Sequence, residues 1–374
     1  MKAVISAWAR SPFHFAKKGA LAAVRPDDLA AQVVKGLLAR TDLDPALLDD
    51  VILGCAYPEA AQGNNLARIV GLLAGLPHAV GGMTVNRFCG SSMQAVHIAA
   101  AQIEAGMGEA FLCVGVESMT MVPQGGFNFS PNPALPEAYI SMGETAENVA
   151  QRWNVSRADQ EQLAVESHRK AAQAREQGRL RDEIVAITTA AGAVVDADGC
   201  IRPGTNLDAL AALKPAFRPD GVVTAGTASP LTDGAAVVLV TSDAFAAKHR
   251  LPMLARITSF ATVGVDPAIM GIGPIPATRK ALARAGLTVA DLGVVEINEA
   301  FSSQALACLR DLGLDPATVN LDGGGLAIGH PLGATGARIT GKAAALLVRE
   351  NARYALATQC IGGGQGIATV LERV

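Results

Sequence analysis

The sequence predicts an α/β layered fold, and three observations support that prediction. Short β-rich runs alternate with segments of helical spacing along the chain, which is the pattern of α/β proteins. A weak repeat relates the two ends of the chain, because residues 36–51 resemble residues 280–295. Of the 374 residues, 50% are hydrophobic and only 17% are charged, so the chain can form a large core and is not globally disordered.

The individual elements follow one another in a regular order. The apolar run at the N-terminus is interrupted at Arg10 and is too short for a signal peptide, so it predicts a first strand. Residues 27–40 have helical spacing and begin with acidic residues, as helices often do. The other predicted elements are strands at 51–53, 83–86 and 110–115 and helices at 90–104, 157–177 and 336–347.

The repeat continues in the same order in both halves. Residues 85–89 lead into a helix much as residues 319–330 do, and the strand ending at Gly115 resembles the strand ending at Cys360. These likenesses predict that one unit occurs twice, although Ala- and Leu-rich helices can look alike by chance. Residues 118–230 break the repeat, and their prolines and glycines near the start predict an irregular excursion.

Charge and hydropathy exclude two classes of partner. The formal net charge is -3, without the basic face that nucleic-acid binding requires. The longest uncharged, mainly apolar stretch is residues 69–86. It is broken by Pro77 and several glycines and does not predict membrane insertion. We therefore expect a soluble, cytoplasmic protein.

Six cysteines are present, and none forms a C-x-x-C pair. A zinc knuckle or a thioredoxin-type site is therefore not expected, and a Cys/His metal site lacks local ligand spacing. Four of the cysteines have no surrounding motif and are expected to be small buried hydrophobes, namely Cys55, Cys113, Cys200 and Cys308.

Three positions carry candidate chemistry. Cys89 lies where a strand ends and a helix begins, and the helix dipole there is expected to lower its pKa. Gly90 is expected to leave room for a substrate. His330 lies in a glycine-dense run, and Cys360 opens a glycine-rich turn whose N–H groups can stabilise an oxyanion. An activated thiol with a base is one interpretation; a structural role for Cys89 and His330 is the alternative.

Residues 336–343 nearly match a phosphate-binding loop. Ala343 stands where a Ser or Thr hydroxyl would have to reach magnesium, and no strand closely precedes the segment. The segment is better interpreted as a helix, and nucleotide hydrolysis is not expected.

Taken together, these segments resemble the thiolase family over essentially the whole chain. The matching segments are residues 85–95 around Cys89, Asn-Glu-Ala-Phe at 298–301, Gly-His-Pro at 329–331 and Cys-Ile-Gly at 360–362. The resemblance implies the thiolase fold, in which duplicated βαβαβαββ halves form a five-layer α-β-α-β-α sandwich with an inserted loop domain. The implied division is 1–117 plus 231–253 for the N-terminal half, 118–230 for the CoA-binding loop domain and 254–374 for the C-terminal half.

The resemblance also implies residue roles. Cys89 would take up the acyl group as a thioester, and His330 would accept the Cys89 proton. Cys360 would exchange a proton with the α-carbon of the acetyl-CoA enolate. Asn298 would position a water in one oxyanion hole with His330, and the N–H groups of Cys89 and Gly362 would form the other.

Coenzyme A and acetyl-CoA would be cosubstrates, with no permanently bound cofactor and no metal. By resemblance, the pantetheine, acyl and adenine parts would contact eight residues: Met142, Arg202, Leu213, Phe217, Ala225, Ser229, Ala300 and Phe301.

Within the family, several features resemble degradative 3-ketoacyl-CoA thiolases of fatty-acid β-oxidation. Residues 91–97 and 366–374 carry this likeness, whereas residues 142–150 and 262–267 also resemble biosynthetic acetoacetyl-CoA thiolases. Ser141 replaces the His that is typical of the biosynthetic enzymes. A non-catalytic acyl-CoA-binding protein is the second alternative. The short segment 123–139 predicts a homodimer, with a dimer of dimers and a β-oxidation partner enzyme left open.

Overall fold

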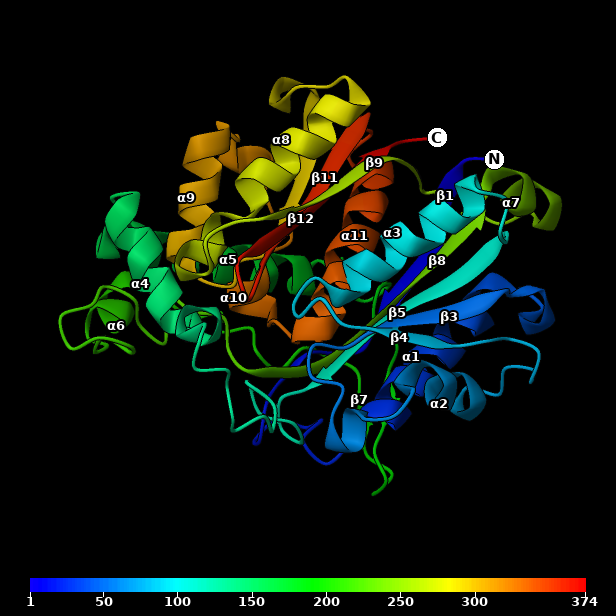
Figure 1. Cartoon of the computed structure of the whole chain (residues 1–374), viewed down its shortest axis with the longest axis horizontal. Helices are drawn as coiled ribbons and strands as arrows, with labels where there is room; N and C mark the ends of the chain where they lie inside the picture. The colour runs from blue at the N-terminus through cyan, green and yellow to red at the C-terminus, as the bar shows by residue number, and fades with distance from the viewer.

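The structure is a computed structural model that describes residues 1–374 and is built on a 10-stranded sheet (Figure 1). The strands of this sheet are β1 (Ala3–Arg10), β2 (His14–Phe15), β3 (Asp50–Gly54), β4 (Met83–Val85), β5 (Ala110–Ser118), β8 (Thr232–Ser242), β9 (Ala255–Gly264), β10 (Leu292–Ile297), β11 (Tyr354–Ile361) and β12 (Gln365–Glu372). A separate two-stranded sheet consists of β6 (Ile187–Thr188) and β7 (Val194–Val195). All five strands expected from the sequence, at the N-terminus, at 51–53, 83–86 and 110–115 and before Cys360, are confirmed as β1, β3, β4, β5 and β11.

The helices are α1 (Pro26–Thr41), α2 (Leu66–Leu73), α3 (Ser91–Glu104), α4 (Met142–Arg152), α5 (Arg157–Glu176), α6 (Leu207–Ala211), α7 (Asp243–His249), α8 (Pro274–Ala285), α9 (Ser302–Leu312), α10 (Gly325–Ile328) and α11 (Leu332–Arg349). Side-chain oxygens of Ser141, Ser156 and Ser242 cap the helices that follow them, which satisfies free N–H groups of the first turn. No helix is long and apolar enough to cross a membrane.

The sheet topology repeats itself. One half has the strand order β4-β3-β5-β8-β1, and the other has β10-β11-β12-β9, with Val319 bridging to Val295 of β10 as the remnant of a further strand. Strands β4, β3 and β5 run parallel in one half, as do β10 and β11 in the other, and the next pair in each half, β5/β8 or β11/β12, is antiparallel. The pairs that follow, β8/β1 and β12/β9, are antiparallel as well. The predicted duplication is therefore confirmed as a repeated fold unit. The halves meet where Val4 and Ile5 of β1 pair with β9.

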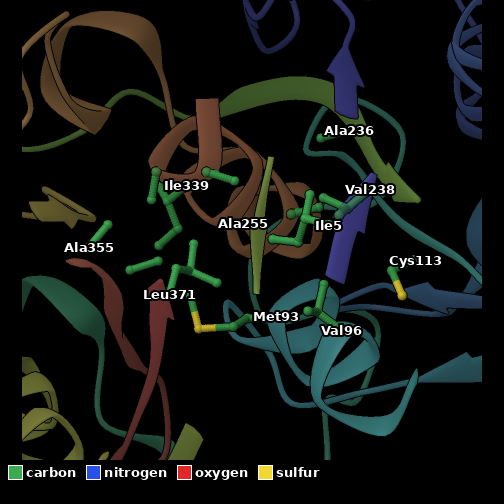
Figure 2. Packing of buried hydrophobic residues seen from close by; sticks show 14 of the residues in the cluster. Ile5, Met93, Val96, Cys113, Ala236, Val238, Ala255, Ile339, Ala355 and Leu371 are labelled. Atoms are coloured by element: carbon green, nitrogen blue, oxygen red, sulfur yellow. The ribbon is translucent and has the colours of Figure 1, made fainter. Parts of the chain in front are cut away.

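Three buried clusters separate five layers. The largest cluster contains side chains of α3 and α11 together with inward-facing residues of strands from both halves, so these two helices form the middle layer. Figure 2 shows Met93 and Val96 on α3 and Ile339 on α11 directed into this space. A second cluster joins α1 and α2 to the outer face of one half, and a third joins α8 and α9 to the outer face of the other. Because successive strand residues alternate between faces, each sheet half supplies two clusters. The α-β-α-β-α sandwich is confirmed.

A long excursion separates the paired strands β5 and β8. Ser118 at the end of β5 pairs with Asp233 at the start of β8, so residues 119–231 leave and re-enter the sheet side by side. The excursion contains α4, α5, α6 and the small β6/β7 sheet, and residues 123–140 are largely irregular, as the sequence predicts. Its status as a loop domain with the boundaries given above stays a prediction.

Buried ion pairs attach this excursion to the rest of the molecule. Arg10 on β1 contacts Glu183 at 2.7 Å and Asp198 at 2.6 Å. Lys342 on α11 contacts Glu183 at 2.8 Å and also Asp322 at 2.7 Å, and all five side chains are at most 5% exposed. The excursion is therefore joined by charge to both β1 and the segment that leads to His330.

Candidate active site

A tight turn between β4 and α3 presents Cys89. Phe88 adopts a φ of 41°, in the left-handed region that non-glycine residues rarely occupy. Two side chains hold this turn, because Asn86 Oδ1 accepts a hydrogen bond from the Phe88 N–H at 2.8 Å and Ser91 Oγ accepts one from the Arg87 N–H at 2.9 Å. The turn fixes the direction in which the Cys89 thiol points.

Cys89 differs from the other cysteines in accessibility. It is half-buried, whereas the remaining five cysteines are buried. The structural role predicted for Cys55, Cys113, Cys200 and Cys308 is consistent with their burial in the core, and all six cysteines are free thiols.

Gly90, the residue after Cys89, lies against two strands. A Cβ atom on Gly90 would lie 2.5 Å from Cδ1 of Ile361 and 3.3 Å from Cγ2 of Ile367. Gly90 therefore allows α3 to approach β11 and β12, and the expectation that it leaves room for a substrate stays a prediction.

The pKa of the Cys89 thiol also departs from the prediction. Burial raises this pKa to about 12, and the nearby Glu117 carboxylate raises it further, whereas the backbone N–H groups of Gly362 and Cys89 act in the opposite direction. The expected lowering by the helix dipole was wrong, because loss of hydration outweighs the dipole. The resting residue is a thiol, and it needs a base to become a nucleophile.

His330 is oriented by hydrogen bonds at both ring nitrogens. Its Nδ1 lies 2.6 Å from Oγ1 of Thr335, and that hydroxyl donates to the Pro331 carbonyl at 3.0 Å. Thr335 therefore accepts from an Nδ1–H, which leaves Nε2 as the unprotonated nitrogen, and Asn298 Nδ2 donates a long hydrogen bond to it at 3.3 Å. Burial, with a contribution from the charge of Arg338, lowers the pKa of His330 to about 3, so the imidazole is neutral and can accept a proton.

The residue after Asn298 anchors this region. The buried Glu299 carboxylate accepts hydrogen bonds from Ser167 at 2.6 Å, Asn320 at 2.7 Å and the Leu326 N–H at 3.3 Å. It thereby joins α5, the strand-like residues after α9 and the glycine-rich run. Oδ1 of Asn298 is buried without a partner, which is a position that a bound water or substrate atom could satisfy.

Cys360 lies at the end of β11, close to Cys89. Burial raises the pKa of Cys360, and the neighbouring Cys89 adds to the effect, which places the two sulfurs within electrostatic reach of each other. Gln359 Nε2 donates to the Cys89 carbonyl and links the two segments. Cys360 packs in an apolar cluster with Met270, Ala300 and Phe301, so the thiol faces a largely nonpolar space.

Most of the residues implied as CoA contacts lie near this cluster. The Ser229 N–H donates to the Ala300 carbonyl at 2.9 Å, and the ring of Phe217 lies 6.0 Å from that of Phe301. Three more of the implied residues lie nearby. Ala225 is exposed on the same loop as Ser229, and Ala228 of this loop forms a bridge to Phe301. Leu213 lies beside Gly226, and the Met142 sulfur would be 3.4 Å from a Cβ on Gly362.

Arg202 has different neighbours from these residues. Its guanidinium lies over the ring of Phe15 at 4.9 Å, and its backbone N–H donates to Nδ1 of His168 at 3.1 Å. Its role at the adenine stays a prediction. No group of three or more His, Cys, Asp or Glu side chains is arranged to hold a metal ion.

Comparison with known families covers nearly the whole chain. Residues 3–244 match the family model described as "Thiolase, N-terminal domain", and residues 251–373 match "Thiolase, C-terminal domain". The chain belongs to the thiolase family. The predicted resemblance to the family is thus confirmed.

Individual relatives of this thiolase carry a consistent name. The chain is 49% identical to a 3-ketoacyl-CoA thiolase of Saccharophagus degradans, covering 99% of this chain and 98% of the relative. It is 48% identical to a 3-ketoacyl-CoA thiolase of Pseudoalteromonas translucida, with 98% and 97% covered. The crystal structure of human mitochondrial 3-ketoacyl-CoA thiolase in complex with CoA superimposes with a TM-score of 0.93 at 36% identity, covering 100% of this chain and 98% of that one.

Besides Thr335, sequence reasoning missed a carboxylate in the thiolase site, Glu117. The buried Glu117 carboxylate accepts hydrogen bonds from the N–H groups of Ala56 at 2.8 Å and Gly333 at 2.9 Å, and from Gln62 Nε2 at 2.8 Å. It therefore ties the start of α11, next to His330, to the Cys89 side of the site. An acid inside the otherwise apolar run 110–118 was the available signal.

Proposed function

We propose that this thiolase catalyses CoA-dependent cleavage of 3-ketoacyl-CoA to acyl-CoA and acetyl-CoA, as a degradative acyltransferase. The observation that carries the proposal is the convergence of three segments: Cys89 packs against a cluster that contains Leu332, two residues after His330, and the Cys89 and Cys360 sulfurs lie within electrostatic reach of each other. The names of relatives about 49% identical over the full length support the degradative reaction over the biosynthetic one.

In the first half-reaction, Nε2 of His330 accepts the proton of Cys89, and the thiolate attacks C3 of the 3-ketoacyl group. The bond between C2 and C3 breaks, the acyl group remains on Cys89 as a thioester, and the electron pair passes to the acetyl-CoA enolate. Cys360 gives its proton to the enolate carbon, and acetyl-CoA leaves.

In the second half-reaction, Cys360 takes the thiol proton of a new CoA molecule, and the CoA sulfur attacks the thioester. The Cys89–acyl bond breaks, acyl-CoA leaves, and the Cys89 sulfur regains its proton from His330. Ping-pong kinetics follow from the covalent intermediate.

Negative charge develops on a carbonyl oxygen in both steps. The N–H groups of Cys89 and Gly362 are assigned to the oxyanion of the acyl group on Cys89, because both act on that sulfur. Asn298 and His330 are assigned to the enolate oxygen. Oδ1 of Asn298, which has no partner, would hold a water that donates to that oxygen. The residues around Ala300 and Ser229 are assigned to the pantetheine and acyl chain of CoA.

The deciding experiment is thiolysis of 3-ketoacyl-CoAs of increasing chain length, followed by loss of the enolate absorbance. Wild type should cleave these substrates, and Cys89→Ala should lose activity by at least about 10⁴-fold, because the covalent route is removed. Cys113→Ala is the control: Cys113 is a buried thiol of the hydrophobic core with no proposed role in the reaction, so this variant should retain activity. Retained activity in Cys89→Ala would refute the proposal.

We further propose that the protein is a homodimer in the cytoplasm. The outer edge of β4 has no partner strand within the chain, and its three residues are only half-buried, so a second copy can pair there. Light scattering should give twice the mass of 38.3 kDa. Thr84→Pro, which removes an edge N–H, should shift the mass toward the monomer, and a tetramer mass for wild type would contradict the dimer.

A further inference from the structure

A second polar layer lies next to the two residues that contact His330. Thr335 and Asn298 hold the two ring nitrogens. Arg338 follows Thr335 by three residues on α11, so it lies on the same face of the helix, roughly 5 Å further along. Glu296 precedes Asn298 by two residues at the end of β10, so it lies on the same side of that chain. Arg338 Nη1 donates to Glu296 Oε2 at 3.2 Å. This ion pair therefore joins the same two segments, α11 and the end of β10, whose residues Thr335 and Asn298 contact His330.

This charge pair is poorly satisfied. The side chains of Arg338 and Glu296 are 2% and 0% exposed, yet Nε and Nη2 of Arg338 and Oε1 of Glu296 have no hydrogen-bond partner. A buried ion pair with unsatisfied groups contributes less to stability than apolar residues of the same size. Burial also raises the pKa of Glu296 to about 7, so near neutral pH it offsets only part of the Arg338 charge. Stability alone does not account for such a pair.

We propose that Arg338 is a positioning residue that acts through His330: its buried positive charge opposes protonation of the imidazole, and Glu296 sets how much of that charge His330 experiences. The inference rests on the proposed function, in which His330 is the base that takes the proton of Cys89. Burial is the larger cause of the lowered pKa of His330, and the Arg338 charge adds to it, so the base stays unprotonated at pH values where an ordinary histidine begins to take up a proton.

The other charged groups around His330 are hydrogen-bonded or paired with partners of their own. Carboxylates from β5, β8 and the residues after β10 are hydrogen-bonded by Gly333, Thr120 and Ser167, and Asp322 is paired with Lys342. The thiols of Cys89, Cys200 and Cys360 have pKa values raised by burial and are uncharged near neutral pH. The charged groups concerned are Glu117, Asp233, Glu299, Asp322 and Lys342. Arg338 is the one charge that shifts the pKa of His330.

The test is a titration of His330 that needs no turnover. Histidine-labelled protein is followed by nuclear magnetic resonance against pH, and the His330 signal is assigned by its absence in His330→Asn. Arg338→Met removes the positive charge and should raise the pKa of His330 by about one unit, the effect of a unit charge at roughly 10 Å in protein. Arg338→Lys keeps the charge and should titrate like wild type.

Glu296→Gln should shift the pKa of His330 in the opposite direction from Arg338→Met, if at all. It removes the negative charge that balances Arg338, so the pKa of His330 should fall or stay unchanged, and must not rise. The acid limb of kcat/KM for thiolysis should move with each variant, so that Arg338→Met is about tenfold less active than wild type at a pH below its limb and similar above it. A merely structural role for Arg338 would lower activity at every pH without moving the limb.

Because Arg338→Met leaves Glu296 buried without a partner, the double variant Arg338→Met with Glu296→Leu is measured beside it. It should still raise the pKa of His330. The inference is overturned if His330 titrates at the wild-type pH in both Met variants, or if Arg338→Met and Glu296→Gln shift it in the same direction. Failure of the proposed function would be distinct, because wild type and His330→Asn would then show equal or no thiolysis.

Discussion

Cys89 keeps its proton and His330 lacks one in the resting thiolase, because burial raises the pKa of the thiol and lowers that of the imidazole. Both residues are thus in the form from which proton transfer to His330 can start. The separation of their pKa values also means that thiolate forms only transiently, which protects the nucleophile from unproductive reactions.

The same effect makes buried histidines sensitive to acid. His97 is 2% exposed, lies 2.7 Å from Oγ1 of Thr369 and stacks on Phe260, and burial lowers its pKa to about 3. Between this value and the ordinary value of about 6.5, the unfolded chain binds a proton at His97 that the folded protein does not. The free energy of unfolding therefore falls as the pH is lowered through this window.

His97→Gln should remove part of this acid sensitivity while keeping a polar partner for Thr369. From pH 7 to about pH 5, the variant should lose about 2 kcal/mol less stability than wild type, which corresponds to 1.5 pH units below the unfolded pKa. Urea unfolding at the two pH values measures the difference. Equal losses in the two proteins would show that His97 does not titrate on unfolding.

At the scale of elements, the contact between α3 and α11 sets the spacing of the site. The Cys89 turn leads into α3 and His330 leads into α11, and Gly336 of α11 packs directly on Met93 of α3. A Cβ atom on Gly336 would lie 2.8 Å from the Cβ of Met93 and closer still to its backbone N–H, so a larger residue must push the helices apart.

Gly336→Ala should therefore destabilise the protein by about 1–3 kcal/mol and lower kcat by about 10²-fold, because the thiol and the imidazole separate. Thermal unfolding and the thiolysis assay measure the two effects. Gly71→Ala on α2 is the matched control, since its Cβ would meet Leu76 at 3.5 Å and Val51 at 3.7 Å, both ordinary contact distances, and it should be neutral or slightly stabilising. An active, fully stable Gly336→Ala would contradict this view of the helix contact.

Local patterns predicted the elements around the site because strand and helix signals lie within a few residues of one another. The helix after Cys89 and the strand before Cys360 form as expected. Thr335 and Glu117 were not predicted as site residues, because their partners are brought together only by the tertiary fold. The pKa of Cys89 was predicted in the wrong direction, since burial at the meeting point of two halves cannot be derived from one segment.

At the scale of the whole molecule, Lys342 connects three parts of the chain. It links Glu183 of the excursion to Asp322, which precedes the run leading to His330, and Glu183 is in turn paired with Arg10 of β1. Removing one partner of such a network leaves buried carboxylates without compensation, whereas exposed ion pairs contribute little.

Lys342→Met should lower the free energy of unfolding by about 3 kcal/mol and loosen the excursion. Arg169→Met, which breaks an exposed pair with Glu166 on α5, should change it by less than about 1 kcal/mol. Urea unfolding gives the two energies, and limited proteolysis should cut Lys342→Met within 119–231 faster than wild type. A loss no larger than that of Arg169→Met would show that the network does not hold the excursion.

The pairing of Ser118 with Asp233 has a further consequence for how such an enzyme can diversify. A segment that departs and returns at adjacent positions adds no length mismatch to the sheet, whatever its own size. Evolution, or an engineer, can exchange residues 119–231 as a cassette, provided that the new segment keeps carboxylates in place of Glu183 and Asp198 for the buried Arg10 and Lys342. Cys89, Cys360 and His330 stand outside that cassette and would be left unchanged.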